Sequence, residues 1–227
     1  MTFPPEGTLM NASSFRSRLS SFFLASIFIS PAACLAQSEQ SAVAKSNYVV
    51  SVQDLRMSGK GQKAFDKGSH LLAKGDAAGS LVYLERAIAE YPEHYKAYYD
   101  LGVAHFRLGH TADAERAFQK SIDLTGGNFA PPQFGMGAIL CQNQDFVQAE
   151  KILQRGLDVE PGSAIGKYYL GWAQFALNRL VEAERNVRQA LVRNAKLAEA
   201  RALLETIHRR QALVQSLAES GVANLRP

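Results

Sequence analysis

The chain has 227 residues, of which 20% are charged, and its formal net charge is +4. So small a positive excess argues against a nucleic-acid partner, because nucleic-acid-binding proteins carry strongly basic surfaces. A chain of this length buries a sizeable core without disulfide bonds. Its only cysteines are Cys34 and Cys141.

The N-terminal region has the pattern of an export signal. Arg16 and Arg18 precede an apolar run at residues 22–29, and small residues follow up to Ala36. A basic segment, a short apolar segment and a small-residue cleavage site are typical of a signal peptide. We therefore expect residues 1–36 to be removed by cleavage after Ala36 and the protein to be exported, either periplasmic or secreted.

Three details of this region stay open. The apolar run is much shorter than the ~20 residues that span a bilayer, which favours cleavage over an uncleaved signal anchor. Lipidation of Cys34 is a further alternative, although Pro31 is a poor match to the leucine-like residue that precedes a lipidated cysteine. Either Met1 or Met10 can be the start. Cleavage would remove Arg16, Arg18 and Glu6, which leaves 23 of the 25 basic and 20 of the 21 acidic residues and a net charge of +3. No later segment of the sequence could cross a membrane.

Four glycines recur at a nearly constant interval in the rest of the chain. Gly68, Gly102, Gly137 and Gly171 are spaced by 34, 35 and 34 residues, each within a stretch that reads as helix. A glycine inside a helix costs about 1 kcal/mol relative to alanine. Repetition of this cost indicates a repeated geometric need, namely a second helix that packs too closely to leave room for a Cβ atom. The interval therefore predicts a stack of helical hairpins.

Other positions repeat in the same register. A small residue follows each glycine by twelve positions, a larger apolar residue by sixteen and another small residue by nineteen. The small residues are Ser80, Ala114, Ala149 and Ala183, then Ala87, Ser121, Gly156 and Ala190; the apolar residues are Leu84, Phe118, Leu153 and Val187. This pattern predicts two amphipathic helices in each unit.

The expected organisation follows from this register. Residues 37–58 form a flexible or extended N-terminal arm, residues 59–195 hold four repeats, residues 196–220 form a capping helix and residues 221–227 are a tail. The four repeats span about 61–94, 95–128, 130–163 and 164–197. Their first helices are expected near 61–74, 95–108, 132–142 and 164–177, and their second helices near 77–91, 111–124, 145–159 and 179–193. The fold class is therefore all-α.

This pattern resembles the tetratricopeptide repeat, a helix–turn–helix unit of 34 residues. The units that match best carry Tyr98-x-x-Leu101-Gly102…Ala114…Phe118 and Leu170-Gly171…Ala183…Ala190. The chain departs from the family where Ala64, Gln133 and Lys167 replace an early aromatic residue, and where Gly126 and Ala195 replace a closing proline. The resemblance implies a right-handed α-solenoid with a concave groove, lined by the first helices, that holds peptides or extended protein segments.

Aromatic residues recur on the first helices. The fifth and twelfth positions of each unit are seven residues apart, so they share one helix face, and the ninth position lies beside them. The candidate partner-binding residues at these positions are Phe65, Tyr99, Phe106, Phe134, Tyr168, Trp172 and Phe175. Aromatic side chains supply large contact areas at interfaces. The alternative is that these side chains pack between repeats.

The sequence shows no catalytic constellation. It has no P-loop, no GxSxG and no HExxH motif, and none of its five histidines pairs with another at the spacing of a helical metal site. His105 is expected to be a hydrogen-bonded core residue and Cys141 a buried thiol. We therefore expect no enzyme activity, no cofactor and no metal site.

Two functions fit these observations. The first is an exported scaffold that binds a protein or peptide partner in the concave groove. The second is a structural subunit of an envelope or secretion assembly, held through its end faces or its N-terminal arm. The second draws on the positive C-terminal end, since residues 179–210 contain eight basic and four acidic residues.

Overall fold

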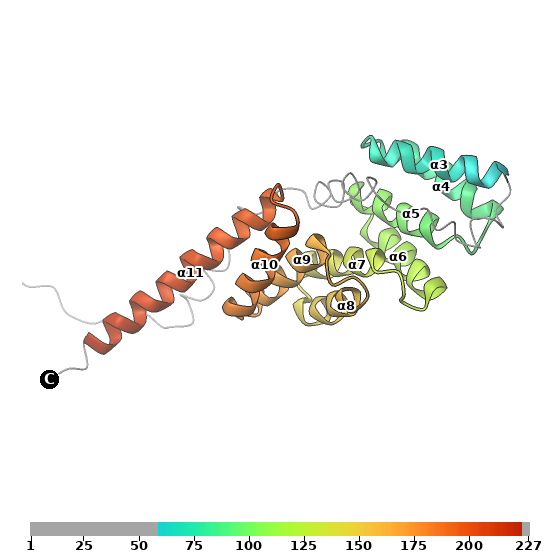
Figure 1. The fold of residues 1–227 in the computed structure, drawn as a ribbon. Coiled ribbons are helices and arrows are strands. Elements are labelled where there is room, and N and C mark those ends of the chain that lie inside the picture. Colours follow the sequence, from blue (N-terminus) through green and yellow to red (C-terminus); the bar gives the residue numbers. More distant parts are fainter. Residues whose placement is uncertain (1–58, 224–227) are drawn as a thin grey trace, which may run out of the picture.

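The computed structural model describes residues 59–223, and side chains up to residue 220. The predicted signal peptide, its cleavage site and the N-terminal arm lie outside the described residues. The described part of the chain is all-α and consists of nine helices (Figure 1). These are α3 (Gly59–Ala73), α4 (Ala77–Glu90), α5 (Tyr95–Arg107), α6 (Thr111–Thr125), α7 (Pro131–Gln142), α8 (Phe146–Val159), α9 (Ala164–Ala176), α10 (Leu180–Arg193) and α11 (Ala198–Ala223).

The helices form four hairpins and a final single helix. Each of α3, α5, α7 and α9 packs against the helix that follows it, and each hairpin packs against the next. The ends of these eight helices lie within one or two residues of the expected positions. The predicted all-α solenoid is thereby confirmed.

The recurring glycines mark the closest contacts within the hairpins. A Cβ atom added at Gly68 would lie 2.8 Å from Cγ of Leu84, and one added at Gly102 would lie 2.5 Å from Cδ1 of Phe118. The corresponding distances are 2.4 Å from Gly137 to Leu153 and 2.5 Å from Gly171 to Val187. In every hairpin the apolar residue sixteen positions after the glycine fills the space of the missing side chain. The predicted reason for the glycines is therefore confirmed.

The first helices form the inner row of the stack. Successive first helices contact one another from α3 through α5, α7 and α9 to α11, whereas successive second helices make only marginal contact or none. A stack whose elements lie closer together on one side curves around that side. The first helices therefore lie on the inner side of the curve.

The turns within the hairpins share one backbone conformation. Gly75, Gly109, Gln144 and Asn178 occupy equivalent positions and have φ values of 89°, 78°, 63° and 64°. Glycine adopts this left-handed region without a steric cost, whereas glutamine does not. The next residue caps the second helix in two hairpins, since Asp76 and Asp145 accept hydrogen bonds from the amides of Gly79 and Gln148.

Helix α11 covers the last hairpin with only its first half. Ala200, Leu203 and Ile207 are buried, whereas every described residue from 212 to 220 is exposed. The second half projects away from the stack (Figure 1). Glu205, which stands where a fifth glycine would fall, is exposed to solvent. Among the described residues, no helix combines the length and the apolar character needed to cross a membrane.

A candidate peptide-binding face on the first helices

The predicted partner-binding residues separate into two groups by burial. Phe106, Phe134 and Tyr168 are buried, with exposed fractions of 6%, 4% and 5%. The other four are half-buried and pack against the core from its edge. These four, Phe65, Tyr99, Trp172 and Phe175, are named here the aromatic row.

The buried group belongs to the packing between repeats. Phe134 of α7 shows this most clearly, because its Cε1 atom would lie 2.6 Å from a Cβ atom added at Gly156 and 2.5 Å from one added at Gly166. The ring is thus held between α8 of its own hairpin and α9 of the next. For Phe106, Phe134 and Tyr168, burial favours the packing alternative, and α7 contributes no residue to the aromatic row.

Trp172 is the centre of an aromatic cluster on α9. Its ring stacks on Tyr169 with centroids 6.0 Å apart and an interplanar angle of 27°, and it lies 6.3 Å from Tyr168. Tyr169 is fully buried. Two buried tyrosines therefore support the half-buried indole and fix its orientation. Periodicity could not reveal that Tyr169 is a core residue, since its position in the unit holds aspartate in the first two repeats.

The aromatic row has a second cluster around Tyr99. The Tyr99 ring lies 5.6 Å from Phe129 at an interplanar angle of 89° and 6.0 Å from Phe118. Phe129, in the loop before α7, was not anticipated because it lies outside the repeated register.

The first member of the aromatic row, Phe65, contacts the ring of His94, with centroids 4.4 Å apart. The hydrogen bond from the Ser69 hydroxyl to the Asp100 carboxylate joins α3 to α5.

The last member of the aromatic row contacts the capping helix. The Arg210 guanidinium lies over the Phe175 ring, 5.3 Å from its centroid, in the geometry of a cation–π interaction. Arg210 is otherwise exposed. An aromatic surface on α9 thus continues into a positive charge on α11.

Cys141, on α7, is buried, as expected. Its sulfur lies 3.8 Å from the carbonyl oxygen of Tyr169, and burial raises the pKa of the thiol to about 12. The thiolate is the nucleophilic form of cysteine. A thiol that stays protonated at neutral pH has a packing role.

Comparison with known proteins places the chain in a family. The tetratricopeptide repeat profile matches residues 65–129 and 136–195, more than half of the chain. The chain therefore belongs to the tetratricopeptide repeat family. A search of curated protein sequences found no match.

Solved structures show the same fold at low sequence identity. One is MamA from Desulfovibrio magneticus RS-1, which is 20% identical over 74% of this chain and 94% of that chain, with a TM-score of 0.60. Another is TTC0263, a thermophilic tetratricopeptide repeat protein of Thermus thermophilus, which is 21% identical over 66% and 82%, with a TM-score of 0.59. The first tetratricopeptide domain of human RPAP3 is 20% identical over 55% and 98%, with a TM-score of 0.50. At these identities, the likenesses support the fold.

Proposed function

We propose that the protein is an exported scaffold that binds a peptide or an extended segment of a partner protein along its first-helix row. The observation that carries this proposal is the aromatic row, in which Trp172 is half-buried and supported by two buried tyrosines. A rigid, partly exposed aromatic ring loses little conformational entropy on binding and offers a large contact area. The proposed export draws on the pattern of residues 1–36, and the scaffold role implies no catalysis.

Trp172 is the only tryptophan in the chain, so its fluorescence reports on this position alone. The binding partner is first identified by crosslinking: a photo-crosslinking aromatic amino acid at position 172 should trap the bound segment in intact cells. The matched control places the same amino acid at Val192, which is 85% exposed on the second helix α10. A specific adduct is expected from position 172 only.

The trapped segment then allows a quantitative test. Its synthetic peptide should change the fluorescence of Trp172 on titration. Measured by calorimetry, Trp172→Ala should weaken binding at least tenfold, a loss of about 1.4 kcal/mol or more, as expected for a hot spot. Val192→Ala should bind as the unchanged protein does. Equal adducts from positions 172 and 192, or full affinity of Trp172→Ala, would contradict the proposal that the aromatic row binds the partner.

Export requires its own measurement. The mass of the protein recovered from the cell envelope or the medium should correspond to a chain that starts at Gln37. An intact N-terminus would indicate a retained anchor, and an added lipid mass on Cys34 would indicate lipidation. Neither result depends on whether the aromatic row binds a partner.

A specific feature favours the second candidate, a structural subunit held through an end face. Leu213, Val214 and Leu217 on the projecting half of α11 are 57%, 54% and 62% exposed. Deletion of residues 212–227 should abolish assembly if this end is the attachment point, and deletion of residues 38–58 should do so if the arm is. Peptide binding by the aromatic row predicts that both shortened proteins retain their partner.

A further inference from the structure

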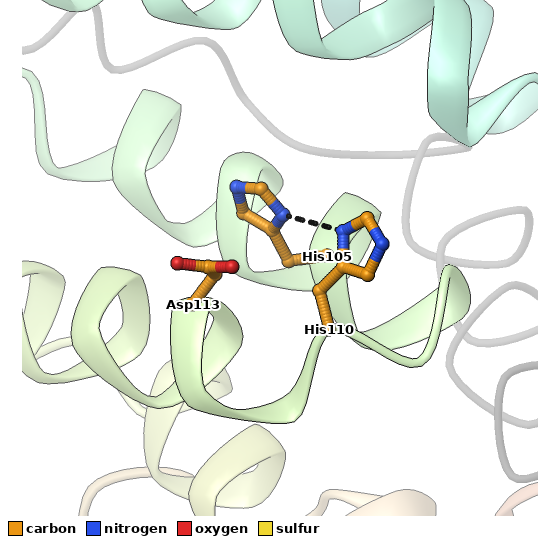
Figure 2. Close-up of side chains that lie close together, drawn as sticks. All are labelled: His105, His110 and Asp113. Atoms are coloured by element: carbon orange, nitrogen blue, oxygen red, sulfur yellow. Dashed lines mark hydrogen bonds between the residues drawn. The ribbon is translucent and has the colours of Figure 1, made fainter.

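The turn between α5 and α6 brings together three side chains that can coordinate a metal ion. His105 lies near the end of α5, His110 stands at the N-cap of α6 and Asp113 lies in the first turn of α6. One ligand atom from each residue lies within 4.8 Å of the others. Figure 2 shows the three side chains gathered at this turn, with a dashed line between the two imidazole rings. The sequence analysis missed this cluster because His105 and His110 are five positions apart across a turn, which is not a spacing that places two residues on one helix face.

The two imidazole nitrogens have the separation that a shared zinc ion requires. Nδ1 of His105 and Nδ1 of His110 are 3.4 Å apart. Zinc binds histidine nitrogen at about 2.0–2.1 Å with tetrahedral angles, which places two such nitrogens about 3.3–3.4 Å apart. Both imidazoles therefore present the same nitrogen at the required distance.

A second observation comes from the helix cap. The positions equivalent to His110 in the first and third repeats hold Asp76 and Asp145, and both aspartates cap their helices. A histidine can do the same, since Nδ1 of His94 accepts a hydrogen bond from the amide of Ala97. The His110 side chain instead makes no capping hydrogen bond. Its Nδ1 atom is turned toward His105.

We propose that His105, His110 and Asp113 form a zinc-binding site that joins the end of α5 to the start of α6. Two imidazoles and one carboxylate are ligands that Zn²⁺ accepts, and a site with three protein ligands keeps a fourth position for water. His110 is exposed, so this position is open to solvent. The site lies at the hairpin turn and is separate from the aromatic row.

One competing interaction bears on the third ligand. The Arg116 guanidinium pairs with Oδ1 of Asp113. The side chain of Arg116 is 75% exposed and that of Asp113 is 43% exposed, and ion pairs between exposed side chains contribute at most about 1 kcal/mol. Rotation of the Asp113 carboxylate toward the imidazoles is therefore inexpensive.

The other repeats supply variants that suit the fold. Position 105 corresponds to Leu71 and Leu140, and position 113 corresponds to Gln148. His105→Leu and Asp113→Gln therefore introduce residues that the repeat already accommodates. His110→Asn keeps a good N-cap residue and removes the imidazole. His208→Gln is the control, because it also removes an imidazole but lies on α11, outside the α5–α6 hairpin, where His208 contacts Glu184.

The test is a calorimetric titration of ZnCl₂ into the full chain, carrying Cys34→Ser and no polyhistidine tag. One Zn²⁺ per chain is expected, with Co²⁺ giving the visible absorption of a tetrahedral site. Because loss of a residue that only supports a ligand already weakens metal binding by about 10–100-fold, His105→Leu and His110→Asn should each weaken it at least tenfold. Asp113→Gln should weaken it less, and His208→Gln should leave it unchanged.

Thermal unfolding gives an independent measurement. Saturating Zn²⁺ should raise the Tm of the chain and of His208→Gln, because a ligand that binds only the folded state stabilises it, and should raise the Tm of His105→Leu by clearly less. Absence of zinc binding would overturn the proposal and leave a simple hydrogen bond between the imidazoles. Binding that survives both histidine replacements, or that His208→Gln abolishes, would overturn it too.

Discussion

The ring of Phe118 occupies the space that a side chain at Gly102 would need. Phe118 is completely buried, and its Cδ1 atom lies 2.5 Å from the position of a Cβ atom at Gly102. Gly102→Ala should therefore destabilise the protein by about 1–3 kcal/mol, because overpacking outweighs the roughly 1 kcal/mol that alanine gains in a helix. Denaturant unfolding followed by circular dichroism measures the change.

Two companion variants separate crowding from any general effect of alanine. Gly59→Ala places its Cβ atom where no atom lies within 4 Å, so it should leave the stability unchanged or slightly higher. The double variant Gly102→Ala/Phe118→Leu should lose less than the sum of the two single changes, since the shorter side chain relieves the contact. A Gly102→Ala protein as stable as the parent would contradict the proposed reason for the glycine.

The left-handed turn residue of the third hairpin offers a route to higher stability. Gln144 has a φ of 63° at a position where two other hairpins use glycine. Gln144→Gly should raise the free energy of unfolding by about 0.5–1 kcal/mol, after the entropy cost of the added glycine is deducted. Gln142→Gly, two residues earlier at the last residue of α7, should instead destabilise the protein by up to about 1 kcal/mol. Destabilisation by both changes would contradict this account of the turn.

The reactivity of Cys141 should report on folding. Burial raises its pKa to about 12, so the thiolate is scarce at pH 8 and the sulfur is shielded from reagents. In a chain with Cys34→Ser, a thiol reagent at pH 8 should label almost no folded protein and should label the denatured protein fully. Mass spectrometry measures both. Rapid labelling of the folded protein would show that α7 opens locally.

The two halves of α11 should differ sharply in their contribution to stability. Ile207 is completely buried, so Ile207→Ala should cost about 2–5 kcal/mol. Deletion of residues 212–227 removes only side chains that are exposed where the structure describes them, and it should change the free energy of unfolding by less than about 0.5 kcal/mol. A large loss on deletion would show that the projecting half contacts the rest of the chain.

The sequence predicted the hairpins well because their cause is local and repeated. Gly102 and Phe118 lie sixteen residues apart within one hairpin, and the same pair of positions recurs in all four, so one physical requirement is visible four times. The helix ends follow from it, since the turns between the helices carry glycine, asparagine or aspartate.

The depth of the aromatic side chains could not be predicted in the same way. Helix periodicity places Phe134 and Trp172 on related faces, yet the first is buried and the second is half-buried. The difference arises because Gly156 and Gly166, from two other helices, leave space for the Phe134 ring. Contacts between hairpins depend on the tilt of each unit against the next. The approach of His105 to His110 was missed for a different reason, because it depends on the local turn at Gly109, whose left-handed conformation reverses the direction of the chain.

Phe118 and Phe134 each rest on glycines from two neighbouring hairpins, at Gly102 and Gly135 for the former and at Gly156 and Gly166 for the latter. If one of the last three hairpins unfolded alone, one of these rings would lose part of its packing and become exposed to water, so none of the three should unfold first. Stacked repeats are joined through nearest-neighbour contacts of this kind. These three hairpins should consequently unfold together, in one sharp transition, and should transmit a mechanical force from one to the next.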